Sequence, residues 1–178
     1  LDCQIAILEN AISRFYCEKK IPKKLGSRHP SISPFEAYKC KDNYLVLAAG
    51  NDHLFEELCK CLNICELLEK DIFKTNSERL KNADKLKAIF ENILKEKNSS
   101  YWVERLERFG VPVGKVNNIE EAINLEQIKS RNMIVNLKKG KTTLLKAAGN
   151  PIKISGYKDI LNRKQAPDLD SDRKKILK

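Results

Sequence analysis

The sequence contains few of the residues that build metal sites. It has two histidines, His29 and His53, and none of its six cysteines forms the C-x-x-C pair typical of structural zinc sites. We therefore expect no metal site. Cys61 and Cys65 are four residues apart in an apolar stretch with helical periodicity, so both are expected to be small core residues on one helix face.

Long apolar runs are also missing. No run approaches the roughly 18 residues that a membrane span needs, and no secretory signal peptide is visible. We therefore expect no membrane partner and a location in the reducing cytoplasm, where free cysteines persist. The chain begins at Leu1, and its first residues read as the middle of an element. The 178 residues are thus expected to be a piece of a longer polypeptide, with a processed protein as the alternative.

Arginine is scarce, because lysine outnumbers it 26 to 8. The net charge of +10 is compatible with nucleic-acid binding, but no arginine-rich stripe interleaved with aromatic residues is present. The densest basic run, residues 138–146, is broken by Gly140 and leucines and is interpreted as a solvated strand edge. We expect no nucleic-acid partner. A basic, non-catalytic binding module stays open as an alternative, and so does weak attraction of a polyphosphate ligand.

The composition fits a globular protein of mixed α/β class, with 42% apolar and 33% charged residues. Two β-hairpins are expected. Their strands are Phe35–Cys40 with Tyr44–Ala48, and residues 133–137 with residues 142–147 around Lys139-Gly140. Asp42 is expected only to form the first hairpin's turn. A helix should follow that hairpin to about residue 63, with Asn51 or Asp52 as its N-cap.

Helical periodicity covers much of the rest. The clearest apolar face runs along residues 77–97, with Asn76 as candidate N-cap. Residues 4–17 and the segment around the single tryptophan, Trp102, are also expected to be helical, with Trp102 in the core. Residues 18–34, rich in Lys, Pro, Gly and Ser, are interpreted as a linker.

The stretch of residues 109–118 carries the strongest backbone signals. A glycine after the Trp102 helix can end it in a left-handed conformation, a proline prevents its continuation, and a second glycine permits a close turn. An asparagine can then cap the next helix, residues 119–124. The residues concerned are Gly110, Pro112, Gly114 and the alternative caps Asn117 and Asn118.

The order of these motifs resembles the family III (CaiB/BaiF-type) coenzyme A transferases. The resemblance runs almost from end to end and rests on short motifs in the family's order. They are Pro34-Phe35-Glu36-Ala37-Tyr38, Ala48-Ala49-Gly50-Asn51-Asp52, Phe73-Lys74-Thr75-Asn76-Ser77-Glu78-Arg79, Tyr101-Trp102, Gly110 to Asn117, Gln127 to Met133, Gly149 to Ile154 and Ala166-Pro167-Asp168-Leu169.

The resemblance implies an α/β fold with two lobes and an interlocked homodimer for the full-length protein. Residues 28–148 would form the small α/β domain. Residues 1–27 would be a helix and linker from the large Rossmann-like lobe, and residues 149–178 a tail that returns to it.

The resemblance also implies a chemistry in which coenzyme A moves between carboxylic acids through an aspartyl-CoA intermediate. The substrates would be an acyl-CoA and a carboxylic acid, with no tightly bound cofactor. The nucleophilic aspartate would lie upstream of Leu1; Asp2 is not that residue. This chain alone is therefore expected to be inactive. An acyl-CoA racemase of the same superfamily, an isomerase, is the alternative.

The implied site residues are those of a lid loop that closes over the reaction centre. The loop comprises Ala48, Ala49, Gly50, Asn51 and Asp52. Residues that could lie near the substrate are His53, Pro112, Gly114 and Asn117. No catalytic residue and no metal ligand is expected within the chain.

Overall fold

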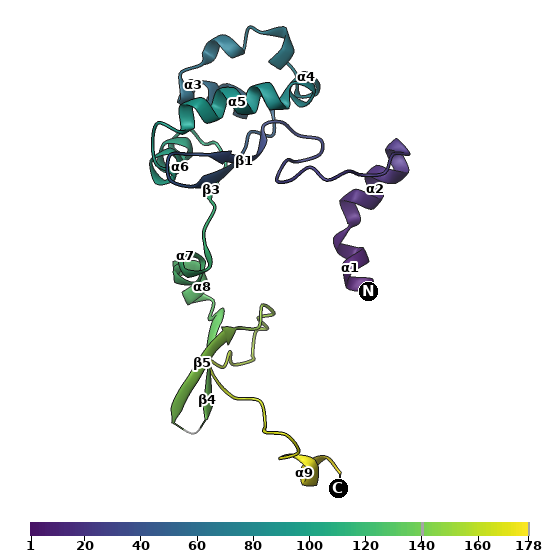
Figure 1. Ribbon diagram of the computed structural model, residues 1–178, viewed down its shortest axis with the longest axis vertical. Helices are drawn as coiled ribbons and strands as arrows, with labels where there is room; N and C mark the ends of the chain where they lie inside the picture. Colours follow the sequence, from purple (N-terminus) through teal and green to yellow (C-terminus); the bar gives the residue numbers. More distant parts are fainter. Residues whose placement is uncertain (140, 178) are drawn as a thin grey trace. The chain divides into compact units, whose positions relative to one another are not determined.

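The computed structural model describes residues 1–139 and 141–177, and it divides the chain into two compact units (Figure 1). The first unit is Leu1–Val116 and the second is Asn117–Lys178. The mixed α/β class expected from the sequence is confirmed, since helices and β-sheets occur in both units. The lobe boundaries at residues 27 and 148 stay a prediction.

The first unit holds one three-stranded sheet and most of the helices. Its elements are α1 (Asp2–Ile7), α2 (Glu9–Glu18), β1 (Phe35–Lys39), β2 (Tyr44–Ala48), α3 (Asp52–Leu62), the 3-10 helices η1 (Cys65–Leu67) and η2 (Asp71–Phe73), α4 (Asn76–Lys81), α5 (Ala83–Leu94), α6 (Ser99–Arg108) and β3 (Val113–Lys115).

The sheet of the first unit has the order β1-β2-β3, with both pairs antiparallel. The β1–β2 hairpin expected from the sequence is confirmed, with Phe35 opposite Ala48 and Lys39 opposite Tyr44. The third strand comes from the stretch in which the sequence predicted a close turn between helices. Gly114 lies within β3 opposite Val46, so the close turn expected there is wrong. Pairing with the open edge of β2 draws this stretch into an extended conformation.

Helices α5 and α6 pack against this sheet, and α3 packs against α6 (Figure 1). The apolar faces of these elements meet in one core. Trp102 is 6% exposed, which confirms its expected core position, and its Nε1 donates to Leu94 O at 2.8 Å. Gly110 ends α6 with a φ of +71°, as the sequence predicted, and Val111 N returns to Leu106 O at 3.0 Å.

The helix expected over residues 77–97 is two helices, α4 and α5, separated at Asn82. The side-chain amide of Asn82 donates to Glu78 O at 3.0 Å and to Ile72 O at 3.3 Å. Such bonds between an asparagine side chain and the backbone compete with helix continuation. Thr75 caps α4 by accepting from Glu78 N, so the expectation that Asn76 is the cap is wrong. The helix expected over residues 4–17 is likewise interrupted, at Leu8.

Helix α3 ends before Cys65, which the sequence placed on the same helix face as Cys61. Asn63 takes a left-handed conformation with φ of 57° and closes the helix after Leu62. Cys61 is buried, but Cys65 lies in the following 3-10 helix and is exposed. The expectation that both share one buried helix face is therefore wrong for Cys65.

The second unit contains a smaller sheet and short helices. Its elements are α7 (Ile119–Asn124), α8 (Glu126–Ser130), β4 (Ile134–Lys139), β5 (Thr142–Ala148), β6 (Asn162–Lys164) and α9 (Arg173–Ile176). Asn118 caps α7 in a capping box with Glu121, which selects one of the two predicted caps.

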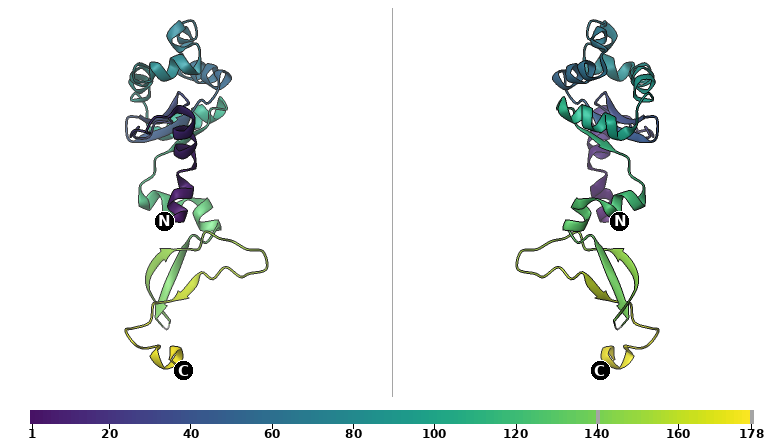
Figure 2. Two further views of the ribbon diagram at one scale, coloured as in Figure 1. Left: turned by 90° about the vertical axis from the view of Figure 1, so that its right-hand side faces the viewer. Right: turned by 90° about the vertical axis from the view of Figure 1, so that its left-hand side faces the viewer.

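The second sheet has the order β5-β4-β6. The β4–β5 hairpin confirms the second expected strand pair and is seen in both views of Figure 2. Its expected turn includes Gly140, which lies outside the described residues. Strand β6, parallel to β4, was not expected, because its three polar residues carry no apolar alternation.

Candidate functional site

The predicted lid loop connects the end of β2 to the start of α3. Its first half is held by backbone hydrogen bonds to two prolines. Ala48 N donates to Pro112 O, and Ala49 N donates to Pro34 O, each at 2.9 Å. Ala49 is fully buried. Pro112, which the sequence offered as a neighbour of the site, is thus in direct contact with the loop.

The second half of the loop is fixed by the start of α3. Asn51 is extended, with φ of −142° and ψ of 173°, and its Oδ1 accepts from Leu54 N at 2.8 Å. This confirms Asn51 as the N-cap. The N–H groups of Asp52 and His53 precede the first intrahelical hydrogen bond, so they lie at the positive end of the helix dipole. They can donate to an anionic oxygen.

The middle of the loop faces solvent. Gly50, Asn51, Asp52 and His53 are all exposed. A Cβ added at Gly50 would meet Ile32 Cγ2 at 4.0 Å, an ordinary van der Waals contact, so close packing does not demand glycine here. The exposed backbone of this segment is therefore open to a ligand or to another protein surface.

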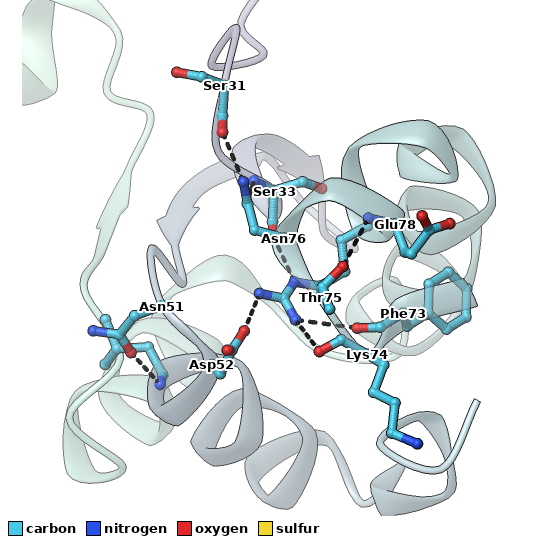
Figure 3. A network of polar contacts seen from close by, with 11 residues as sticks. Ser31, Ser33, Asn51, Asp52, Phe73, Lys74, Thr75, Asn76 and Glu78 are labelled. Atoms are coloured by element: carbon cyan, nitrogen blue, oxygen red, sulfur yellow. Dashed lines mark hydrogen bonds and ion pairs between the residues drawn. The ribbon is translucent and has the colours of Figure 1, made fainter. Parts of the chain in front are cut away.

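Beneath the loop lies Arg79, which is 1% exposed. Its Nη2 lies 2.6 Å from Asp52 Oδ1, and its Nε donates to Ser33 O at 2.9 Å. Its Nη1 donates to the carbonyl oxygens of Phe73 at 3.1 Å and Lys74 at 3.3 Å. Figure 3 shows acceptors from two segments: the Asp52 carboxylate at the start of α3, and the carbonyls of the adjacent Phe73 and Lys74 at the end of η2.

Two further contacts complete the surroundings of this cation. The Arg79 guanidinium lies over the Phe55 ring, 4.5 Å from its centroid. Asn76 bridges the segment before β1, because its Nδ2 donates to Ser31 O at 2.9 Å and its Oδ1 accepts from Ser33 N at 3.0 Å (Figure 3). Asn76, the first residue of α4, thus ties this helix to the chain beside the loop.

The sequence did not assign Arg79 or Asn76 to the site. Both belong to the stretch Phe73 to Arg79 that carried part of the resemblance, and that stretch was the available signal. An arginine one turn from an N-cap usually faces solvent, so its burial follows only from tertiary contacts, among them those with Asp52 and Phe55 of α3.

The remaining predicted site residues are distributed as follows. His53 lies on the exposed first turn of α3, and Gly114 is exposed on β3. Asn117 begins the second unit. Their proximity to a substrate stays a prediction.

A small cavity of about 190 Å³ opens beside Asp52. Its walls combine apolar and charged side chains, namely Asp52, Phe55, Glu56, Leu68, Phe73, Lys74 and Arg79. Within residues 1–139 and 141–177, no group of three or more His, Cys, Asp or Glu side chains is arranged to hold a metal ion. Over the same residues, no helix has the length and apolar character that crossing a membrane requires.

Comparison with known proteins reveals relatives that are more than twice as long. Residues 1–173 match the model of CoA-transferase family III. An acetyl-CoA:oxalate CoA-transferase from Acetobacter aceti is 37% identical over 169 residues, covering 95% of this chain and 42% of the relative. The succinyl-CoA:glutarate CoA-transferase of Homo sapiens is 30% identical over 158 residues, covering 89% of this chain and 36% of the relative.

A solved structure has a similar fold. The crystal structure of a CAIB/BAIF family protein from Brucella suis superposes with a TM-score of 0.80 at 29% identity, over 99% of this chain and 45% of that one. The chain therefore spans less than half the length of these relatives. The match of the family model over nearly every residue, together with this likeness in fold, shows that the chain belongs to CoA-transferase family III.

Proposed function

We propose that these residues form the lid-bearing part of an enzyme that moves coenzyme A between two carboxylic acids. The carrying observation is the loop from Ala48 to Asp52, whose ends are fixed by Pro112, Pro34 and Arg79 while its middle is exposed. A loop of fixed path with an open backbone can cover a reaction centre and donate hydrogen bonds to it.

In the proposed reaction, the carboxylate of an aspartate of the enzyme attacks the carbonyl carbon of the donor thioester. The carbon–sulfur bond breaks, coenzyme A leaves as a thiolate, and a mixed anhydride forms. The thiolate then attacks the enzyme's carbonyl in the anhydride, which releases the donor acid and leaves an aspartyl-CoA thioester. The acceptor carboxylate then attacks the aspartyl-CoA carbonyl, expels the thiolate and forms a second anhydride. The thiolate attacks the acceptor's carbonyl in that anhydride, which releases the new thioester and restores the aspartate carboxylate. Covalent catalysis thereby divides one difficult exchange into easier ones.

This chain would supply hydrogen-bond donors and shielding. Each tetrahedral intermediate carries a negative oxygen, which the N–H groups of Asp52 and His53 could stabilise. Asp52 itself is poorly suited as the nucleophile, because its carboxylate is paired with Arg79 at 2.6 Å. We therefore assign the attacking aspartate to a segment outside the 178 residues.

The size of the cavity beside the loop supports a site completed by another surface. Its volume of about 190 Å³ lies below the roughly 300–1,000 Å³ of typical ligand pockets. It cannot enclose an acyl-CoA alone. The large lobe and an interlocked second subunit, in a cytoplasmic enzyme, would provide the remaining walls.

A chimeric enzyme tests this proposal. Residues 1–173 replace the matching segment of the Acetobacter aceti relative, and transfer of a labelled carboxylic acid into a CoA thioester is measured. We expect transfer by the chimera and none by the 178-residue chain alone. The unaltered relative, assayed in parallel, controls for the substrates used.

Three outcomes would contradict the proposal. Turnover by the isolated chain would place the nucleophile within it. A folded chimera that racemises a 2-methyl-branched acyl-CoA without transferring CoA would favour the isomerase. Retention of the chain on DNA or RNA, falling steeply with added salt, would favour the basic binding module.

A further inference from the structure

The pair formed by Arg79 and Asp52 joins the interior of the first unit to the lid loop. The Arg79 side chain is 1% exposed, whereas the Asp52 side chain is 77% exposed. An exposed carboxylate can detach from its partner without uncovering the core. The contact is therefore the part of the network that can open while the rest stays in place.

Both ends of the loop depend on the same neighbouring residues. Arg79 Nε donates to Ser33 O, and the next residue, Pro34, accepts from Ala49 N. The guanidinium thus holds the helix end of the loop through Asp52 and the chain beside its strand end through Ser33. A shift of Arg79 would move both ends of the segment that presents Gly50 and Asn51.

The contacts of Arg79 divide between the interior of the unit and the loop. Arg79 already donates to three carbonyl oxygens, those of Ser33, Phe73 and Lys74, and lies over the Phe55 ring. These contacts use the Nε and Nη1 donors, whereas Nη2 donates to Asp52, which also supplies the counter-charge of the buried cation. The additional bond to Asp52 selects an orientation for the first turn of α3.

We propose that Arg79 is a positioning residue for the lid: through Asp52 it fixes the direction in which the N–H groups at the start of α3 point. This inference rests on the proposed function for its catalytic meaning, but the mechanical coupling can be measured without turnover. Asp52 and Arg79 then form a latch whose closure sets the geometry of the loop.

Hydrogen exchange in the 178-residue chain tests the latch. Asp52→Asn keeps a hydrogen-bond acceptor but removes the charge. We expect amides of residues 48–55 to exchange about three- to fivefold faster in this variant, while amides of α5 keep their protection. Asp52→Glu, which restores the carboxylate, should recover most of the protection.

Asp84→Asn is the matched control. Asp84 also stands in the first turn of a helix, its side chain is 92% exposed, and its Oδ1 pairs with Arg28 Nη2 at 2.7 Å. We expect this variant to leave exchange in residues 48–55 unchanged. Equal loop exchange in Asp52→Asn and the unaltered chain would overturn the proposal. Faster exchange spread equally over α5 would also overturn it, since it would indicate a general loss of stability.

Kinetics of the chimeric enzyme test the effect of the Arg79–Asp52 pair on catalysis. There Asp52→Asn should lower kcat at least fivefold while KM for the CoA thioester changes less than about twofold, because the loop is misdirected and the substrate still binds. Asp84→Asn should leave both constants unchanged. An unchanged kcat despite faster loop exchange would refute the positioning role. A chimera without any transfer would instead count against the proposed function, and the exchange experiment would still decide whether the latch exists.

Discussion

Asp42, in the β1–β2 turn, accepts two hydrogen bonds from Ser99, the first residue of α6. Ser99 N lies 2.7 Å from Asp42 Oδ1, and Ser99 Oγ lies 3.1 Å from Oδ2. The carboxylate thereby caps a helix that starts 57 residues later in the chain. The sequence suggested that Asp42 only forms a turn; the structure gives it a second role, which tertiary contact alone creates.

The Asp42 cap should make the stability of the first unit depend on pH. The hydrogen bond from Ser99 N holds the pKa of Asp42 below its usual value of 3.8. A carboxyl with a lowered pKa stabilises the fold above its unfolded pKa, and this contribution disappears as the pH falls through the folded pKa. Between about pH 5 and pH 3, Asp42→Asn should therefore lose less stability than the unaltered chain.

Urea unfolding followed by tryptophan fluorescence at each pH measures this difference. Asp71→Asn is a suitable control, because Asp71 is highly exposed and pairs with Lys74 only at 3.5 Å. Identical pH profiles for Asp42→Asn and the unaltered chain would argue against the cap.

The two glycines of the stretch after α6 should respond differently to alanine. Gly110 has a φ of +71°, where a Cβ is strained, so Gly110→Ala should cost about 1 kcal/mol. Gly114 lies in β3, and a Cβ there would have no heavy atom within 4 Å, so Gly114→Ala should be neutral or slightly stabilising. Urea midpoints of the two variants give the comparison. Equal destabilisation would restore the interpretation of Gly114 as a turn residue.

Trp102 should contribute through its nitrogen as well as its ring. Trp102→Phe removes the donor to Leu94 O and leaves that carbonyl unsatisfied, at a cost of about 2 kcal/mol with the lost volume included. The neighbouring Tyr101 is 42% exposed, so Tyr101→Phe should change the free energy of unfolding by less than about 0.5 kcal/mol. Thermal unfolding by circular dichroism measures both. A Trp102→Phe variant as stable as the unaltered chain would show that the hydrogen bond contributes little.

The cysteines should divide into two classes of reactivity. Cys3, Cys17 and Cys65 are exposed, whereas Cys40, Cys59 and Cys61 are buried. Burial raises the pKa of Cys40 to about 11 and that of Cys59 to about 12, which lowers the thiolate fraction further. A maleimide at about pH 7.5 should modify the exposed group rapidly and the buried group only after denaturation. Mass spectrometry locates the labels, and protection of Cys65 would favour the buried helix face that the sequence suggested for Cys61 and Cys65.

Local sequence patterns determined several elements. Alternating apolar residues on either side of the turn at Asp42 predict the β1–β2 hairpin, and the structure confirms it, with the first strand ending at Lys39, one residue before the predicted end. Asn51 and Asn118 were identified as candidate caps, because short polar side chains satisfy the free N–H groups of a helix start. These signals act within a few residues, so the sequence alone can carry them.

Other features depended on which segments meet. Asn82 ends α4 because its amide reaches Ile72 O, and Gly114 became a strand residue because the edge of β2 was available. Apolar periodicity registers neither the side-chain hydrogen bonds of an asparagine nor a strand edge that lies far away in the sequence.

The amino-acid sequence by itself determined the α/β class, the loop from Ala48 to Asp52 and the kinship with family III, since all three are written in local order and spacing. Tertiary structure decided that Arg79 lies beneath that loop, 27 residues from Asp52 along the chain and 2.6 Å from it in space. The physical reason is that a buried cation is tolerated only where several segments together supply its acceptors, and the folded chain alone brings those segments to one point.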